Sequence, residues 1–199
     1  MEEKLKESTA KNQYTAKAYT YADYLTWPEE SPVELIEGIP HAMTAPTRLH
    51  QEIVGEVFRQ IANYLVGKPC KTYVAPFDVR LADSQAEDED IINVVQPDIV
   101  VVCDQDKVND DGRYEGVPTL VVEVLSPSTK EKDLVKKLNL YMTSGIAEYW
   151  IVDLESRILL QYFFAEDRSI QSIKSFSVGD VAQSSIFEGL DVPLDNIFV

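Results

Sequence analysis

Two acidic residues interrupt segments that otherwise carry apolar side chains, and they are the first candidates for chemistry. Glu123 lies in the middle of Leu120–Leu125 (LVVEVL), and Asp98 follows Pro97 at the head of DIVVVC, residues 98–103. A buried carboxylate is costly unless it is paired, hydrogen-bonded or bound to a metal. If the two segments are neighbouring strands, the carboxylates converge, and such a pair raises one pKa or recruits a divalent ion such as Mg²⁺. Alternatively, Asp98 caps a turn and Glu123 pairs with a lysine or with backbone amides.

A lysine on the helix predicted for Lys130 to about Ser144 can reach the two acids. The apolar stripe of this helix consists of Leu134, Val135, Leu138, Tyr141 and Met142. Lys137 falls at the margin of the stripe, whereas Lys132 and Lys136 are expected on the opposite side. An ammonium beside two carboxylates and a metal can orient a water or stabilise charge on a phosphate. Alternatively, Lys137 forms a helix-surface pair with Asp133 at i, i+4 spacing.

The elements that position these residues follow from the periodicity of apolar side chains. The sequence predicts a helix over Arg48–Val66 with Thr47 as N-cap, strands over Lys71–Leu81, 98–103 and 119–125, the helix closed by Gly145, and a strand over Glu148–Asp153. The crossover helix makes the last two strands parallel. A hairpin that turns at Glu37 and Gly38 precedes this series, and short strands follow Arg157. The predicted class is mixed α/β.

Two further residues are candidates of second rank. His50 falls inside the apolar arc of its helix, where it can hold a ligand water or a phosphate, or serve as a buried structural histidine. Glu37 can contribute to a site or simply shape the hairpin turn with Gly38. Ser126 and Ser128 precede a helix and are interpreted as caps.

Length and composition bound the class of protein. The chain has 199 residues, which predicts a tail over residues 1–18 and a single domain over 19–199. Cys70 and Cys103 lie in apolar runs and are interpreted as buried thiols, which favours a reducing, cytoplasmic location. No apolar run is long enough to span a membrane. The formal net charge of −16 disfavours nucleic acid at long range.

Other site classes lack their motifs. The sequence contains no GxGxxG, no P-loop and no GxSxG, and two distant cysteines do not make a zinc set. The acidic run 104–112 does not have the ligand spacing of an EF-hand.

Several motifs in one order resemble a known family. They are Gln96-Pro97-Asp98, then Glu123-Val124-Leu125-Ser126-Pro127-Ser128, then Asp133, Lys137, Tyr141, Gly145, Glu148-Tyr149-Trp150 and Asp153. The hairpin with Glu34, Glu37 and Gly38, followed by Pro46 and His50, adds to them. This pattern resembles a largely uncharacterised family described as putative restriction endonucleases, assigned to the PD-(D/E)XK nuclease superfamily. The match covers about residues 18–165, and the last strands lie outside it.

The resemblance implies a restriction-endonuclease-like αβββαβ core with a mixed sheet, an N-terminal β hairpin and extra C-terminal β strands. It also implies that Asp98, Glu123 and the Val124 carbonyl bind Mg²⁺ or Mn²⁺. The sequence departs from the pattern at Leu125, where the motif has lysine, so either Lys137 replaces that lysine or the site is inactive.

Two functions therefore follow from the resemblance and the residues. The first is a metal-dependent nuclease acting on DNA, with weak or partner-assisted binding because of the acidic surface. The second is an inactive nuclease-fold module that acts as an oligomeric or regulatory partner. The strands after residue 157 and the aromatic segment 148–150 suggest a homodimer, which would suit cutting of two strands.

Overall fold

The structure is a computed structural model that describes residues 18–28, 33–82, 86–110, 113–126, 130 and 132–198. The tail predicted for residues 1–18 lies outside this part of the chain except for Ala18, and so do residues 127–129, including Ser128. Across the described ranges, no helix has both the length and the apolar character needed to cross a membrane.

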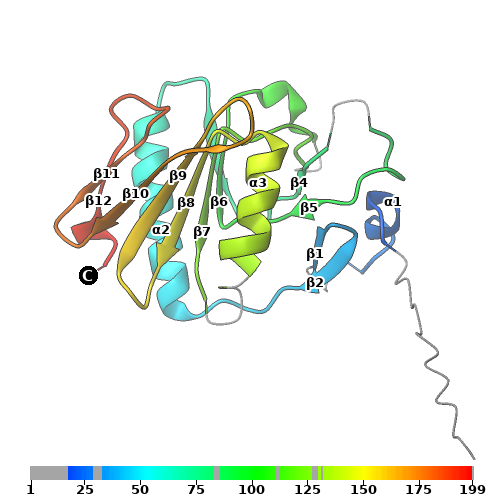
Figure 1. The fold of residues 1–199 in the computed structure, drawn as a ribbon, viewed down its shortest axis with the longest axis horizontal. Helices are drawn as coiled ribbons and strands as arrows, with labels where there is room; N and C mark the ends of the chain where they lie inside the picture. The colour runs from blue at the N-terminus through cyan, green and yellow to red at the C-terminus, as the bar shows by residue number, and fades with distance from the viewer. Residues whose placement is uncertain are drawn as a thin grey trace, which may run out of the picture.

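A six-stranded sheet forms the centre of the molecule (Figure 1). Its strands are β3 (Lys71–Val74), β6 (Ile99–Val102), β7 (Leu120–Val124), β8 (Glu148–Asp153), β9 (Ile158–Phe164) and β10 (Ile170–Ser177), in the order β10-β9-β8-β7-β6-β3. Strands β7 and β8 are parallel, and all other neighbours are antiparallel. With helices α2 (Arg48–Leu65) and α3 (Leu138–Ser144), these strands confirm the predicted αβββαβ core and mixed sheet.

The two helices cover opposite faces of this sheet (Figure 1). Successive side chains of a strand point to opposite faces, so Val122 packs toward Val57 of α2 while Val121 packs toward Tyr141 of α3. Glu123 shares the face of Val121, where its neighbours are the side chains of the α3 segment. The strand periodicity thus places one carboxylate on a face that is otherwise apolar.

A second, four-stranded sheet carries the N-terminal hairpin. Its strands are β1 (Val33–Ile36), β2 (Ile39–Ala42), β4 (Val79–Arg80) and β5 (Val94–Val95), in the order β2-β1-β5-β4. The short helix α1 (Tyr21–Tyr24) precedes the hairpin and begins with a capping box at Thr20. The hairpin turns at Glu37 and Gly38 as predicted, and both residues adopt positive φ angles, 52° and 73°.

The structure corrects two predicted boundaries. The strand predicted for Lys71–Leu81 is divided into β3 and β4, which belong to different sheets, because Pro76 between them has no amide to donate to a ladder. The loop predicted between residues 82 and 96 contains β5, whose Val94 pairs with both β1 and β4 and whose Val95 pairs with β4.

The predicted orientation of the second helix is wrong in part. Residues Lys132–Lys137 form a π-helix, η2, before α3 begins. Residues five apart face the same way in a π-helix, whereas at 3.6 residues per turn they diverge. Lys132 therefore turns toward the protein together with Lys137, and Val135, expected in the buried stripe, is 62% exposed.

The two cysteines form a disulfide, so their interpretation as thiols is wrong. Cys70 precedes β3 and Cys103 follows β6, and the antiparallel register that pairs Lys71 with Val102 places the cysteines opposite each other. Because the thiol interpretation supported a reducing compartment, the cytoplasmic location loses that support and stays a prediction.

The C-terminal part adds the predicted extra strands. Strands β9 and β10 extend the central sheet, and β11 (Val181–Gln183) pairs with β12 (Asp191–Pro193) in a separate ribbon. Short 3₁₀ turns complete the elements, η1 (Gln105–Lys107) and η3 (Leu194–Asn196). The fully buried Glu148 accepts hydrogen bonds from Trp150 Nε1 at 2.8 Å and from Ser184 Oγ at 2.6 Å, which ties this part to the sheet.

Two glycines provide a matched test of the hairpin. Gly38 has a φ of 73°, and a Cβ built there lies 2.7 Å from the Cβ of Ala18, whereas a Cβ on Gly55 of α2 meets nothing within 4 Å. We expect Gly38→Ala to lower the free energy of unfolding by about 1–3 kcal/mol. Gly55→Ala should raise it by up to about 1 kcal/mol. Urea unfolding measures the free energy of unfolding of both variants. If Gly38→Ala is as stable as the wild type, the hairpin geometry is contradicted.

Candidate active site

A cavity of about 870 Å³ brings most of the predicted site residues together. Asp98, Glu123, Val124, Lys137 and His50 all line it, although they come from α2, β7, η2 and the residue before β6. The remaining candidate, Glu37, is exposed in the hairpin turn and is not among the lining residues. The Glu37 amide donates to Asn93 Oδ1 at 2.8 Å, which agrees with a role in shaping the turn.

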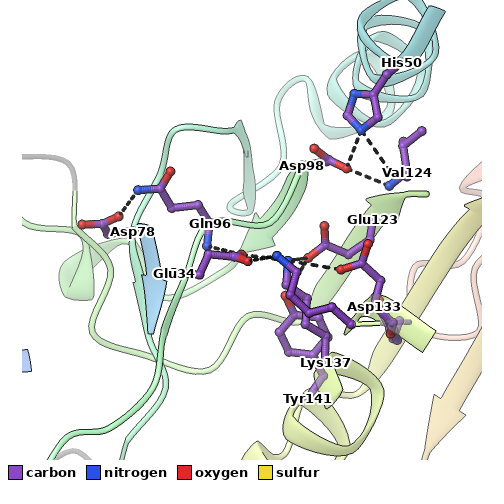
Figure 2. Close-up of polar contacts among 12 residues, drawn as sticks. Glu34, His50, Asp78, Gln96, Asp98, Glu123, Val124, Asp133, Lys137 and Tyr141 are labelled. Atoms are coloured by element: carbon purple, nitrogen blue, oxygen red, sulfur yellow. Dashed lines mark hydrogen bonds and ion pairs between the residues drawn. The ribbon is translucent and has the colours of Figure 1, made fainter. Parts of the chain in front are cut away.

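Lys137 is the centre of a buried group of charges (Figure 2). Its Nζ lies 2.7 Å from Glu34 Oε1, 2.7 Å from Glu123 Oε1 and 3.7 Å from Asp133 Oδ1. The Tyr141 hydroxyl donates to the same oxygen of Glu123 at 2.7 Å. The Lys137 side chain is 3% exposed and that of Glu34 is fully buried. The interpretation of Lys137 as part of a helix-surface pair is therefore wrong, because Asp133 and Lys137 both face the interior.

Burial and charge act in opposite directions on these groups. Burial raises the pKa of Glu123 above its ordinary value, because the Lys137 ammonium only partly offsets the lost solvation and the carboxylates of Asp133, Asp98 and Glu34 add to the shift. Burial also opposes the charge on Lys137, but Glu123 and Glu34 raise its pKa above the ordinary value. For Glu34, Lys137 and Lys132 outweigh burial and lower the pKa to about 2.

A second group of contacts joins His50, Asp98 and Val124 at the end of β7 (Figure 2). The Val124 amide donates to Asp98 Oδ2 at 2.7 Å, and His50 Nε2 lies 3.3 Å from that oxygen and 3.0 Å from the Val124 carbonyl oxygen. Because a carbonyl only accepts, Nε2 is the protonated nitrogen. Burial opposes a charge on the imidazole, but Asp98 and the Val124 carbonyl raise the pKa of His50.

The strand register explains why the two acids line one cavity. Strands β6 and β7 are antiparallel, and their ladder begins with the pair Ile99 and Val122. Asp98 and Glu123 are the next residues at that end, so both lie beside the same opening. Asp98 keeps 20% of its side chain exposed, whereas Glu123 keeps 5%. The two acids therefore differ in accessibility: Asp98 is open to the cavity, whereas Glu123 is buried against Lys137 and Tyr141.

The donor set fits a hard divalent ion. Asp98, Glu123 and the Val124 carbonyl offer oxygen atoms, which Mg²⁺ prefers, and Mg²⁺ needs only one or two protein carboxylates beside water and phosphate oxygens. In the part of the chain that the structure describes, no cluster of three or more His, Cys, Asp or Glu side chains is arranged to hold a metal. Any ion at this site would rely on the carbonyl and on non-protein ligands as well as on the two acids.

Two residues of the site, Glu34 and Lys132, were missed as candidates from the sequence. Glu34 accepts from both Lys137 and Lys132, and the Gln96 amide donates to its Oε1 at 3.1 Å. A signal for Glu34 was present, since it interrupts the apolar strand VELI as Glu123 interrupts LVVEVL. The signal for Lys132 was hidden, because its orientation depends on the π-helix.

Three comparisons with known proteins each find a match that covers most of the chain. Residues 21–195 match the family Uma2, described as "Putative restriction endonuclease". The chain is 24% identical over 178 residues to the uncharacterized protein slr1290 of Synechocystis sp. (strain ATCC 27184 / PCC 6803 / Kazusa), covering 88% of this chain and 89% of that protein. It resembles the crystal structure of a putative nuclease belonging to DUF820 from Anabaena variabilis ATCC 29413, with a TM-score of 0.73 and 18% identity over 90% of this chain and 97% of that one.

These matches bear out the resemblance that the motifs indicated and correct its extent. The match with the family runs to residue 195, so the C-terminal strands, which we expected to lie outside the family, belong to it. The similarity to the Anabaena structure shows that the fold is shared.

The low pKa of Glu34 makes a testable contribution to stability at acidic pH. Because the folded-state pKa of about 2 lies below the ordinary value of 4.5, Glu34 stabilises the fold fully above pH 4.5, and this contribution is lost as the pH falls toward 2. We expect Glu34→Gln to lower the free energy of unfolding at pH 7 by about 3 kcal/mol. Its stability should also fall less steeply than that of the wild type below pH 4.5.

Glu37→Gln is the matched control, because Glu37 belongs to the same hairpin and is exposed. Urea unfolding between pH 2.5 and 7 should give this control the profile of the wild type. If the free energy of unfolding falls equally steeply below pH 4.5 in Glu34→Gln and in the wild type, the two lysines do not stabilise the ionised form of Glu34.

Proposed function

This chain belongs to the Uma2 family, and we propose that it is a metal-dependent nuclease that hydrolyses phosphodiester bonds, with DNA as its substrate. The family and the shared fold support a nuclease-like function. The observation that carries the proposal is the convergence of Asp98, Glu123 and the buried Lys137 on one cavity. The proposal also includes the homodimer and the cytoplasmic location that the sequence analysis predicts.

Asp98, Glu123 and the Val124 carbonyl would hold the ion, Mg²⁺ or Mn²⁺. When bound, a divalent ion supplies Lewis-acid activation of a water and neutralises charge on the phosphate. Contacts within the protein orient two of these ligands, Asp98 and the Val124 carbonyl. The Val124 amide holds one Asp98 oxygen, and His50 Nε2 contacts both that oxygen and the Val124 carbonyl. His50 is thus a positioning residue in this proposal.

Lys137 takes the place of the lysine that the nuclease motif has at Leu125. Leu125 is buried in the apolar core and carries no charge, whereas the Lys137 ammonium lies 2.7 Å from Glu123. There it holds the Glu123 carboxylate in one orientation and adds a positive charge beside the cavity, where phosphate charge develops. In hydrolysis, a water oxygen bonds to phosphorus, the bond to the departing oxygen breaks, and one proton moves from the water to that oxygen through solvent.

The charge of the protein limits how it meets its substrate. With a net charge of −16, the surface repels a polyanion, and at ordinary salt concentrations this repulsion is largely screened beyond about 8–10 Å. A bound divalent ion dominates the field close to it, so the chemistry is compatible with this charge. We therefore expect weak DNA binding, or delivery of the DNA by a partner.

Asp98→Asn tests the proposal without disturbing the buried charges. The asparagine oxygen can still accept from the Val124 amide, so the fold is kept while the charge at the cavity is lost. Removing Lys137 would be a poorer test, because it leaves the buried Glu123 without an ammonium partner. We expect cleavage of plasmid and short duplex DNA in Mn²⁺ or Mg²⁺ to fall about 100-fold or more in Asp98→Asn. Calorimetry should show a matching loss of Mn²⁺ binding.

Asp106→Asn is the control, because Asp106 is exposed on η1, and it should cleave as the wild type does. Equal activity of Asp98→Asn and the wild type would remove Asp98 from the site. If the wild type binds no metal and cleaves no DNA, the nuclease proposal is contradicted, and the alternative of an inactive nuclease-fold module is favoured.

A further inference from the structure

Lys132 shares its carboxylate partner with Lys137. Its Nζ lies 2.5 Å from Glu34 Oε2, while Lys137 Nζ lies 2.7 Å from Glu34 Oε1. The two lysines are five residues apart at the two ends of the π-helix η2, which turns both toward the hairpin. One carboxylate therefore binds two ammonium groups, one at each of its oxygen atoms.

The two lysines differ in how tightly they are held. Lys137 is 3% exposed and is surrounded by Glu34, Glu123 and Asp133. The Lys132 side chain is 16% exposed and lines the cavity, and among the described residues its ion-pair partner is Glu34 alone. Of the two lysines, Lys132 is therefore the one whose ammonium group can more readily exchange its carboxylate partner for another anion.

Release of Lys132 would not leave Glu34 as an unpaired buried charge. Glu34 Oε1 keeps the Lys137 ammonium at 2.7 Å and the Gln96 amide at 3.1 Å. A buried charge is expensive when its last partner is removed, and here partners remain. When another anion takes the Lys132 ammonium, Glu34 therefore keeps one ammonium and one backbone amide as partners.

Four acidic residues line the cavity beside Lys132 (Glu34, Asp98, Glu123 and Asp133), but one segment of its rim carries no charged side chain. Residues 39–47 (IPHAMTAPT) contain no Asp, Glu, Lys or Arg, although the chain as a whole has 34 acidic residues. Residues 40–47 of this segment line the cavity, and most of them are exposed. A phosphate that enters over this segment, which we call the uncharged lip, avoids the repulsion that the rest of the surface exerts on it.

We propose that Lys132 binds a phosphate group of the substrate, exchanging the Glu34 carboxylate for a phosphate oxygen, while Lys137 stays with Glu34 and Glu123. This inference rests on the proposed nuclease function and adds a substrate-binding residue to it. The two lysines then have separate tasks, since Lys132 contributes to affinity and Lys137 to the reaction. The exchange forms and breaks no covalent bond.

Binding of a labelled oligonucleotide in EDTA tests this without any cleavage. Fluorescence anisotropy at several salt concentrations compares the wild type with Lys132→Gln, Lys132→Arg and Lys136→Gln. Lys136 is the matched control, because it lies on the same helix and is exposed. We expect Lys132→Gln to weaken binding about tenfold and to lower the slope of log K against log salt by about 0.7–0.9. Lys132→Arg should restore binding to within about threefold, and Lys136→Gln should match the wild type.

The outcomes separate this inference from the proposed function. If the wild type binds and Lys132→Gln binds equally well, the role of Lys132 is wrong and the nuclease proposal stands. If the wild type binds no oligonucleotide in EDTA and cleaves none in Mn²⁺ or Mg²⁺, the proposed DNA substrate is itself contradicted. In cleavage assays, Lys132→Gln should raise KM with kcat nearly unchanged. A fall in kcat without a rise in KM, or a loss that Lys132→Arg does not restore, would show a structural role and overturn the inference.

Discussion

The buried ammonium of Lys137 is the interaction on which the site depends. Glu34 and Glu123 come from different sheets and share this ammonium; without it Glu123 would lose its ion-pair partner in the interior, and Glu34 would keep only Lys132 as an ion-pair partner among the described residues. Desolvation is repaid only when such groups are paired closely and hydrogen-bonded further, and Tyr141 and the Gln96 amide supply those additional bonds. The same contacts that allow the charges to be buried also join the hairpin to the core.

Burial of an acid is not by itself a sign of chemistry in this protein. Glu148 is as deeply buried as Glu34, but its hydrogen-bond donors are an indole, hydroxyl, amide and backbone N–H groups, and it lies at the start of β8 away from the cavity. Glu123 and Glu34 instead meet ammonium groups beside an opening. The type of partner and the access to solvent distinguish a structural carboxylate from a candidate catalytic one.

Much of the fold was predictable because it rests on local patterns. Apolar periodicity located α2 and β8 to within a residue, and Thr47 caps α2 as its sequence position indicated. The parallel pairing of β7 and β8 followed from the helix between them. The π-helix was not predictable from apolar periodicity, and its two terminal lysines meet Glu34, which lies far away in the chain. The pairing of Cys70 with Cys103 was missed because a cross-strand register decides it.

The sequence alone determined which residue types interrupt apolar strands, and therefore that Asp98 and Glu123 needed partners. It also determined the order of elements, since periodicity and caps act over a few neighbouring residues. Only the tertiary structure decided which residues those partners are. Glu34 lies 98 residues from Lys132 in the chain, and His50 lies 74 residues from Val124. Contacts of that range depend on how sheets and helices pack, and no local pattern records the packing.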